Sequence, residues 1–221
     1  MALRYLVTLF ATLSCGIILA QNGYEIRVKV SGYESSQLVL GYQYGGKQYI
    51  RDTVDINENG QFIFAGDEPL DEGLYLLVMQ PDNNFVQFIA DEDNQNFEIS
   101  FGADMSSIVA TTKVKGSQLN ERYYEYLAYL ESKVPAKRAL QDEYEKVKDN
   151  PESVAELQAK MSKIDDEVRD YHEKLVIEQA PNLLSRLINA RLDPVLPEFS
   201  GEDVDVQRYL YYKTHYFDRI D

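Results

Sequence analysis

The sequence predicts a segregated α+β protein, with an N-terminal antiparallel β-sandwich followed by an α-helical region that contains a long coiled-coil-like hairpin. Two observations support this prediction. Over residues 24–115, apolar and polar residues alternate in short runs, which is typical of strands with one buried face. After Gly116, apolar residues recur at spacings of three and four, which is typical of helices. We therefore expect a sandwich domain over residues 21–116 and a helical region over 117–221.

Turn signals divide the first half into eight short expected strands. Gly45-Gly46 and Asn59-Gly60 are pairs that favour tight hairpin turns, and polar turns follow at residues 81–84 and 91–95. A sheet with one apolar face must cover it, so this many strands predict two packed sheets. The strands are expected at residues 26–30, 38–44, 47–56, 62–64, 74–80, 85–90, 97–101 and 109–115.

The second half predicts several helices, of which the third is the clearest. Ser117 is a candidate N-cap for a first helix that runs to residue 133. Pro135 is expected to start a second helix, which runs to residue 149. Asn150 and Pro151 are the expected N-cap and first-turn proline of the third helix. A narrow apolar seam follows, and it needs a partner helix, for which residues 135–149 are nearest. The seam consists of Val154, Leu157, Met161, Ile164, Val168, Tyr171 and Leu175. Two further helices are expected over 183–192 and 204–220.

Residues 1–20 have the pattern of a secretory signal peptide. Arg4 supplies the positive charge, an apolar run follows, and Ala20 ends the expected cleavage site. A lipid anchor at Cys15 is the less favoured alternative, because apolar residues follow this cysteine where a polar tether is expected. We expect an exported chain with no stable membrane span after cleavage.

Charge and cysteine content argue against several classes of function. The chain has 37 acidic and 22 basic residues and a net charge of −15, which disfavours binding to the phosphates of nucleic acids. Cys15 is the only cysteine and lies in the leader, so the mature chain has no thiol for a disulfide, dithiol redox chemistry or Cys-ligated zinc. No catalytic residue, metal ligand or cofactor is assigned from the sequence.

Two acidic segments look like cation sites but are interpreted as ordinary turns. Residues 55–60 match the first half of a calcium loop, D-x-[DN]-x-[DN]-G, yet Gly66 stands where a bidentate glutamate is required. The cluster at residues 91–94 joins two expected strands, where adjacent polar residues form a solvated turn.

The histidines and tyrosines are the remaining candidates. His172 is expected to face solvent, and His215 is expected to form a structural hydrogen bond with Asp218, three residues away. Ten of the seventeen tyrosines follow Gly116, and we expect them to line helix packing and an interface; a carbohydrate-stacking surface is the alternative. The chain up to Asp221 stays rich in apolar and aromatic residues, which predicts either a truncation there or a surface buried by a partner.

A set of ordered landmarks resembles a known family. They are Asp52-Thr53-Val54, Asn59-Gly60 with Phe62 and Phe64, Gly73 with Tyr75, the run from Phe88 to Asp93, and Gly116-Ser117 with Asn120. In this order they resemble the N-terminal domain of unknown function found ahead of TlpA-type and AhpC/TSA-like thioredoxin-like proteins of Gram-negative bacteria. Residues 117–221 resemble the helical spacer that follows.

The resemblance implies a periplasmic protein of thiol redox or envelope maintenance, of which this chain is the accessory region. In that family the C-x-x-C belongs to a thioredoxin-like domain that would begin after Asp221, so no catalytic residue carries over. We expect a non-catalytic module for scaffolding, dimerisation or client presentation, with a thioredoxin-like domain in cis or envelope proteins as partners. The alternative is a complete exported protein that binds a glycan, peptide or envelope protein; a carboxylate-based hydrolase has the least support.

Overall fold

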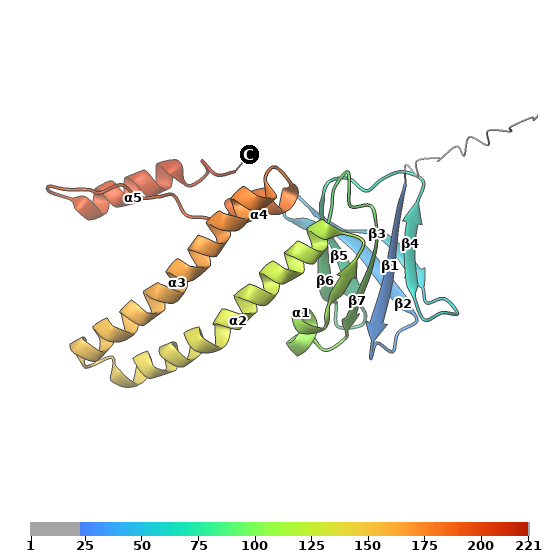
Figure 1. Ribbon diagram of the computed structural model, residues 1–221, viewed down its shortest axis with the longest axis horizontal. Helices are drawn as coiled ribbons and strands as arrows, with labels where there is room; N and C mark the ends of the chain where they lie inside the picture. The colour runs from blue at the N-terminus through green and yellow to red at the C-terminus, as the bar shows by residue number, and fades with distance from the viewer. Residues whose placement is uncertain (1–22, 221) are drawn as a thin grey trace, which may run out of the picture.

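The computed structural model describes residues 23–220, so the expected signal peptide, Cys15 and Asp221 lie outside the described residues. Two four-stranded sheets pack against each other at one end of the molecule, and a long helical hairpin extends away from them (Figure 1). The prediction of a segregated α+β fold is confirmed.

Strands of the two sheets are mixed in the order in which they occur along the chain. One has the strand order β4-β1-β7-β8 and the other has the order β3-β2-β5-β6. The strands are β1 (Tyr24–Ser31), β2 (Gln37–Tyr44), β3 (Lys47–Asp55), β4 (Phe62–Gly66), β5 (Gly73–Met79), β6 (Asn84–Ala90), β7 (Asn96–Gly102) and β8 (Lys113–Lys115).

Alternation along the strands builds the core between the sheets. Ile26 and Phe64 point inward with no exposed surface, while the residues beside them on β1 and β4 are partly or fully exposed; on β2, Leu40 is fully buried and its neighbours are buried as well. Burying a side chain of this size stabilises the fold by about 1.5–3 kcal/mol. Gly45 and Gly46 both have positive φ, 56° and 77°, and form the predicted hairpin turn between β2 and β3.

The prediction of a wholly antiparallel sandwich is wrong at one pair of strands. β1 and β7 run parallel, with Ile26 opposite Phe97. Only strands joined by a tight turn must be antiparallel, and these two are separated by five other strands in the chain. The hairpin expected at Asn59-Gly60 is also wrong, because this turn joins β3 in one sheet to β4 in the other.

The expected strand over residues 109–115 is only half present. A short 3₁₀ turn, η1 (Met105–Ser107), and one helical turn, α1 (Ile108–Thr111), precede the three-residue β8. The carboxylate of Asp104 accepts a hydrogen bond from the backbone N–H of Ser106 at 2.9 Å and caps the first turn. This local cap outweighs the strand preference of the β-branched residues that follow.

Four further helices complete the chain: α2 (Gln118–Val147), α3 (Pro151–Gln179), α4 (Leu183–Asn189) and α5 (Val204–His215). The expected break at Pro135 is wrong, because α2 continues through it. Residues 131–132 and 134–139 are exposed, so water can bond the carbonyl that the proline leaves free. The predicted cap of α3 is confirmed, with the Asn150 side chain accepting from the backbone N–H of Glu152 at 3.1 Å.

Helices α2 and α3 pair as the predicted hairpin, which we call the arm (Figure 1). Ion pairs link the two helices along its outer part, Lys133 with Glu167 at 2.9 Å and Lys137 with Asp165 at 2.6 Å. Within residues 23–220, no helix is long and apolar enough to cross a membrane.

Candidate functional site

A buried polar junction fixes the arm to the sandwich. Asn120, in the first turn of α2, is fully buried beside edge strand β6. Its side chain accepts a hydrogen bond from the backbone N–H of Ile89 at 2.7 Å and donates one to the Ile89 carbonyl at 2.8 Å. The Asn120 side chain thus takes the place of a further strand, and it satisfies both backbone groups of an edge residue.

The residues before Asn120 complete this junction. Ser117 is the N-cap of α2, since its hydroxyl oxygen accepts from the backbone N–H of Asn120 at 3.2 Å. The same hydroxyl donates to the side-chain oxygen of Asn94 at 2.6 Å, in the turn after β6. Gly116 has a φ of +91°, a conformation that favours glycine. The Gly-Ser-x-x-Asn pattern is therefore a structural junction between the domains.

Tyrosines extend the contact from this junction toward the base of the arm. The Tyr124 hydroxyl donates to the Gln87 carbonyl at 2.8 Å, and burial raises the pKa of Tyr124. Tyr126 is buried two positions further along, where α2, α3 and α4 converge. The prediction that these tyrosines line helix packing is confirmed for this part of α2.

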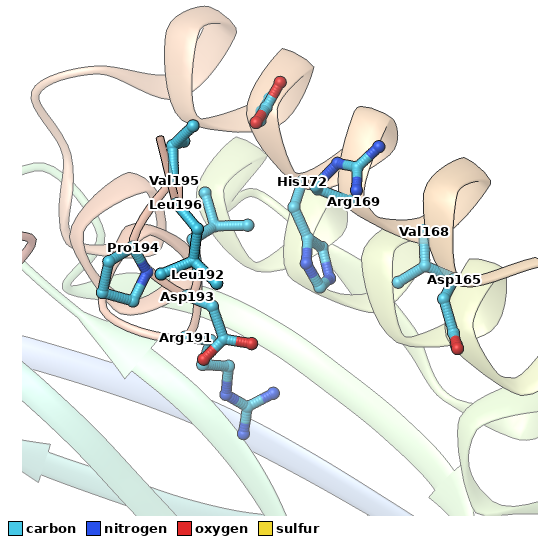
Figure 2. A pocket seen from close by; sticks show the side chains of 11 residues that line it. Asp165, Val168, Arg169, His172, Arg191, Leu192, Asp193, Pro194, Val195 and Leu196 are labelled. Atoms are coloured by element: carbon cyan, nitrogen blue, oxygen red, sulfur yellow. The ribbon is translucent and has the colours of Figure 1, made fainter. Parts of the chain in front are cut away.

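Beneath the base of α3 lies a groove of about 600 Å³, between this helix and the segment that follows α4 (Figure 2). It is lined by Asp165, Val168, Arg169, His172 and Glu173 of α3 and by the contiguous residues 191–196. Leu192, Pro194, Val195 and Leu196 give one wall an apolar surface, and Val195 and Leu196 are exposed. We call this feature the α3 groove.

His172 is the least satisfied polar group of the groove. Figure 2 shows its imidazole pointing into the space between α3 and residues 191–196. Its Nε2 atom is buried and has no hydrogen-bond partner among the described residues. Burial and the nearby charge of Arg191 lower the pKa of His172 below its ordinary 6.5, so the ring is neutral at pH 7. The expectation that His172 faces solvent is wrong.

Charged groups surround the apolar wall without filling the groove. Arg191 donates to the Tyr126 hydroxyl at 3.4 Å, and its guanidinium lies at the edge of the base of the arm. Asp193 accepts a hydrogen bond from the Tyr212 hydroxyl at 2.8 Å, which links the groove to α5. The exposed apolar wall, edged by the guanidinium groups of Arg191 and of the ion-paired Arg169, forms a surface suited to holding a polypeptide segment.

In the two acidic turns, side-chain oxygens bond to backbone N–H groups of the same turn, and within residues 23–220 no group of three or more His, Cys, Asp or Glu side chains is placed to hold a metal ion. Asn57 directs its side-chain oxygen at the backbone N–H groups of Asn59 and Gln61, at 2.9 and 3.0 Å. Asp91 does the same with Asp93 and Asn94, at 3.1 and 2.9 Å. One side-chain oxygen in each segment thus closes the turn, as expected for ordinary polar turns.

The predicted contact between His215 and Asp218 is confirmed at 2.7 Å, at the exposed end of α5. No nucleophile accompanies it: the ring neighbour of His215 is Tyr211, with centroids 4.0 Å apart. Tyr209 and Tyr216 are exposed, so the α5 tyrosines do not pack as those of α2 do.

The groove was not predicted from the sequence, although one signal was present. Residues 193–201 lie between the two helices expected over 183–192 and 204–220 and include two prolines. Within that segment, Val195-Leu196 is an apolar pair without helical or strand periodicity, and this pair is the signal in the sequence.

Residues 24–123 match the family model described as Domain of unknown function (DUF4369). The DUF4369 region contains the whole sandwich and the first residues of α2, so it includes the junction at Gly116, Ser117 and Asn120. All the ordered landmarks of the sequence lie inside it. The α3 groove lies outside it. No curated protein and no solved structure matches the chain.

Proposed function

We propose that this chain is a non-catalytic accessory module of an exported, periplasmic thioredoxin-like thiol–disulfide oxidoreductase, and that the α3 groove holds the thioredoxin-like partner. The observation that supports this most directly is the groove itself. It combines an exposed apolar pair, Val195-Leu196, with a buried imidazole nitrogen on His172 that has no partner among the described residues.

The position of the groove suits such a role. It lies at the base of the arm, where α2 is fixed to the sandwich through Asn120, so a bound partner would have a defined orientation relative to the DUF4369 region. Residues 23–220 contain no cysteine, so any thiol chemistry would reside in the partner. The order of landmarks in the sequence supports the identity of that partner as thioredoxin-like.

The first test is the DNA sequence downstream of the codon for Asp221 and in the neighbouring genes. We expect a thioredoxin-like domain with C-x-x-C, either in the same frame or as an adjacent product. If neither location encodes one, the proposal fails, and the alternative of an exported protein that binds a glycan, peptide or envelope protein takes its place.

The second test measures the groove directly. When the C-x-x-C domain is purified separately, Leu196→Asp in the groove should weaken its association with this chain by about tenfold in calorimetry, because a carboxylate enters the apolar contact. Val206→Asp on α5 is the matched control, since Val206 is exposed to a similar degree and lies outside the groove. Equal weakening by both variants would contradict the assignment of the groove.

A further inference from the structure

A second cavity, unrelated to the α3 groove, opens at the end of the sandwich that faces α4. Its volume is about 290 Å³, close to the lower end of the range of about 300–1,000 Å³ for small-molecule sites. The C-terminal end of β2, the start of β5 and the loop before β5 form its walls. The side chains that matter are those of Tyr42, Tyr44, Arg51, Asp71, Glu72 and Tyr75.

The aromatic wall of this cavity is built in layers. Tyr42 stacks on Tyr49 with ring centroids 5.5 Å apart, and on the other side it lies 6.2 Å from Tyr75, which stacks in turn on Phe88. This row is anchored in the core, because Tyr75 and Phe88 are buried. Tyr44, at the mouth, is 75% exposed. The row therefore forms a rigid backing to the cavity, and the exposed Tyr44 supplies a free ring at its entrance.

The polar groups of the cavity are available for a ligand. Among the described residues Arg51 forms no ion pair; its guanidinium lies 5.6 Å from the centre of the Tyr24 ring. The carboxylate of Asp71 accepts no hydrogen bond from the described residues, although the Asp71 carbonyl accepts one from the Tyr75 hydroxyl at 3.0 Å. Glu72 is neutralised by an ion pair with Arg186 of α4. One free set of donors and one free set of acceptors thus line the same small cavity.

We propose that this cavity binds a neutral sugar ring. An uncharged pyranose has an apolar C–H face that can pack on the exposed Tyr44 ring, and its hydroxyls can accept hydrogen bonds from Arg51 and donate them to Asp71. A cationic ligand would meet the charge of Arg51, and an anionic ligand would meet the charge of Asp71. A neutral ligand with both donors and acceptors is the class that uses every group present.

The proposal does not depend on the thioredoxin-like partner, since the two cavities share no lining residue. If the sugar proposal fails its test, the proposal of a thioredoxin-like partner in the α3 groove is unaffected, and the reverse also holds.

The test is a titration of the purified protein with neutral sugars, namely glucose, galactose, mannose, N-acetylglucosamine, cellobiose and lactose, with glucuronate and choline as charged comparators. The chain has no tryptophan, so tyrosine fluorescence reports on the aromatic wall. We expect saturable binding of at least one neutral sugar below about 10 mM, the range of weak single-site complexes. Glucuronate and choline should not bind.

Variants then locate the binding. Tyr44→Ala should weaken it by about tenfold with an unchanged far-ultraviolet circular dichroism spectrum, because the ring is exposed and its loss leaves the core intact. Arg51→Gln should weaken it by removing the charged donors. Tyr209→Ala, which removes an exposed tyrosine from α5, should leave it unchanged. Absence of saturable binding by every neutral sugar, binding of a charged comparator instead, or equal binding by Tyr44→Ala and the unaltered protein would overturn the proposal.

Discussion

The sandwich and the arm are stabilised by different interactions. Inward side chains of the sandwich such as Leu40 and Phe88 have no exposed surface. In α3 only Leu157 and Leu175 are buried, and the other residues of its apolar seam are half-buried. The outer arm relies on cross-helix ion pairs whose side chains are partly exposed, and such pairs contribute about 0–1 kcal/mol each.

This difference indicates that the sandwich supplies most of the folding free energy and the arm depends on its base. A pair of helices buries only one face of each, and the remaining surface of the arm is charged and solvated. Near the sandwich, Tyr126, Leu175 and Leu184 close a small core with three helices. We therefore expect the outer arm to open locally at a lower free energy than the sandwich.

The largest expected effect comes from the core of the sandwich. Phe88→Ala should lower the free energy of unfolding by about 3–5 kcal/mol, because the ring is fully buried and its neighbours cannot collapse into the space. Urea unfolding followed by circular dichroism measures this change. Phe85→Ala, on the same strand but 38% exposed, is the control and should cost less than about 1 kcal/mol. Similar costs for both would mean that β6 is not the core strand described above.

The second prediction concerns the junction between the sandwich and the arm. Asn120→Ala should cost about 2–4 kcal/mol, because it leaves the N–H and carbonyl of Ile89 without partners in a buried site. It should also expose the arm to limited proteolysis while the sandwich stays resistant.

The control for this second prediction is Asn150→Ala at the tip of the arm. Asn150 caps α3 and contacts no other element through its side chain, so its loss should cost only about 1 kcal/mol. If Asn150→Ala released the arm as readily as Asn120→Ala, the dependence of the arm on its base would be wrong.

The parts of the fold that depend on local patterns were predicted from the sequence. Alternation predicted the strands and two sheets, Asn150-Pro151 predicted the start of α3, and the seam predicted the hairpin. The features that were predicted wrongly depend on contacts between segments that are distant in the sequence. The parallel pairing of β1 and β7 joins residues about seventy positions apart, and no local pattern specifies it.

The α3 groove could not be predicted from the sequence for the same reason. On α3 alone, His172 lies beside the apolar seam and its surroundings are open. Its environment is set by residues 191–196, which return over α3 only because α4 turns the chain back. The sugar cavity likewise joins the ends of β2 and β5 to a loop, and its free Arg51 and Asp71 could not be distinguished from other charged residues in the sequence.

The smallest expected effect is a pH dependence of stability, which tests whether His172 is buried at the base of the arm. Because the pKa of His172 in the folded chain lies below its ordinary 6.5, the unfolded chain binds the proton more tightly and stability falls as the pH drops below 6.5. Burial and the neighbouring charge of Arg191 oppose protonation of His172, whose groove is also lined by Asp165, Arg169, Glu173 and Asp193. Between about pH 7.5 and about pH 5.5, the urea midpoint of the unaltered protein should therefore fall further than that of His172→Gln.

The other histidine supplies the control for this measurement. His215→Gln removes an exposed ring at the end of α5, far from the base of the arm in the chain, and should retain the full fall in midpoint. A fall that persists in His172→Gln and disappears in His215→Gln would place the pH-sensitive contact on α5. The base of the arm would then lack the desolvated imidazole on which the α3 groove depends. In that case α5, and not the arm, would be the region whose stability depends most on pH.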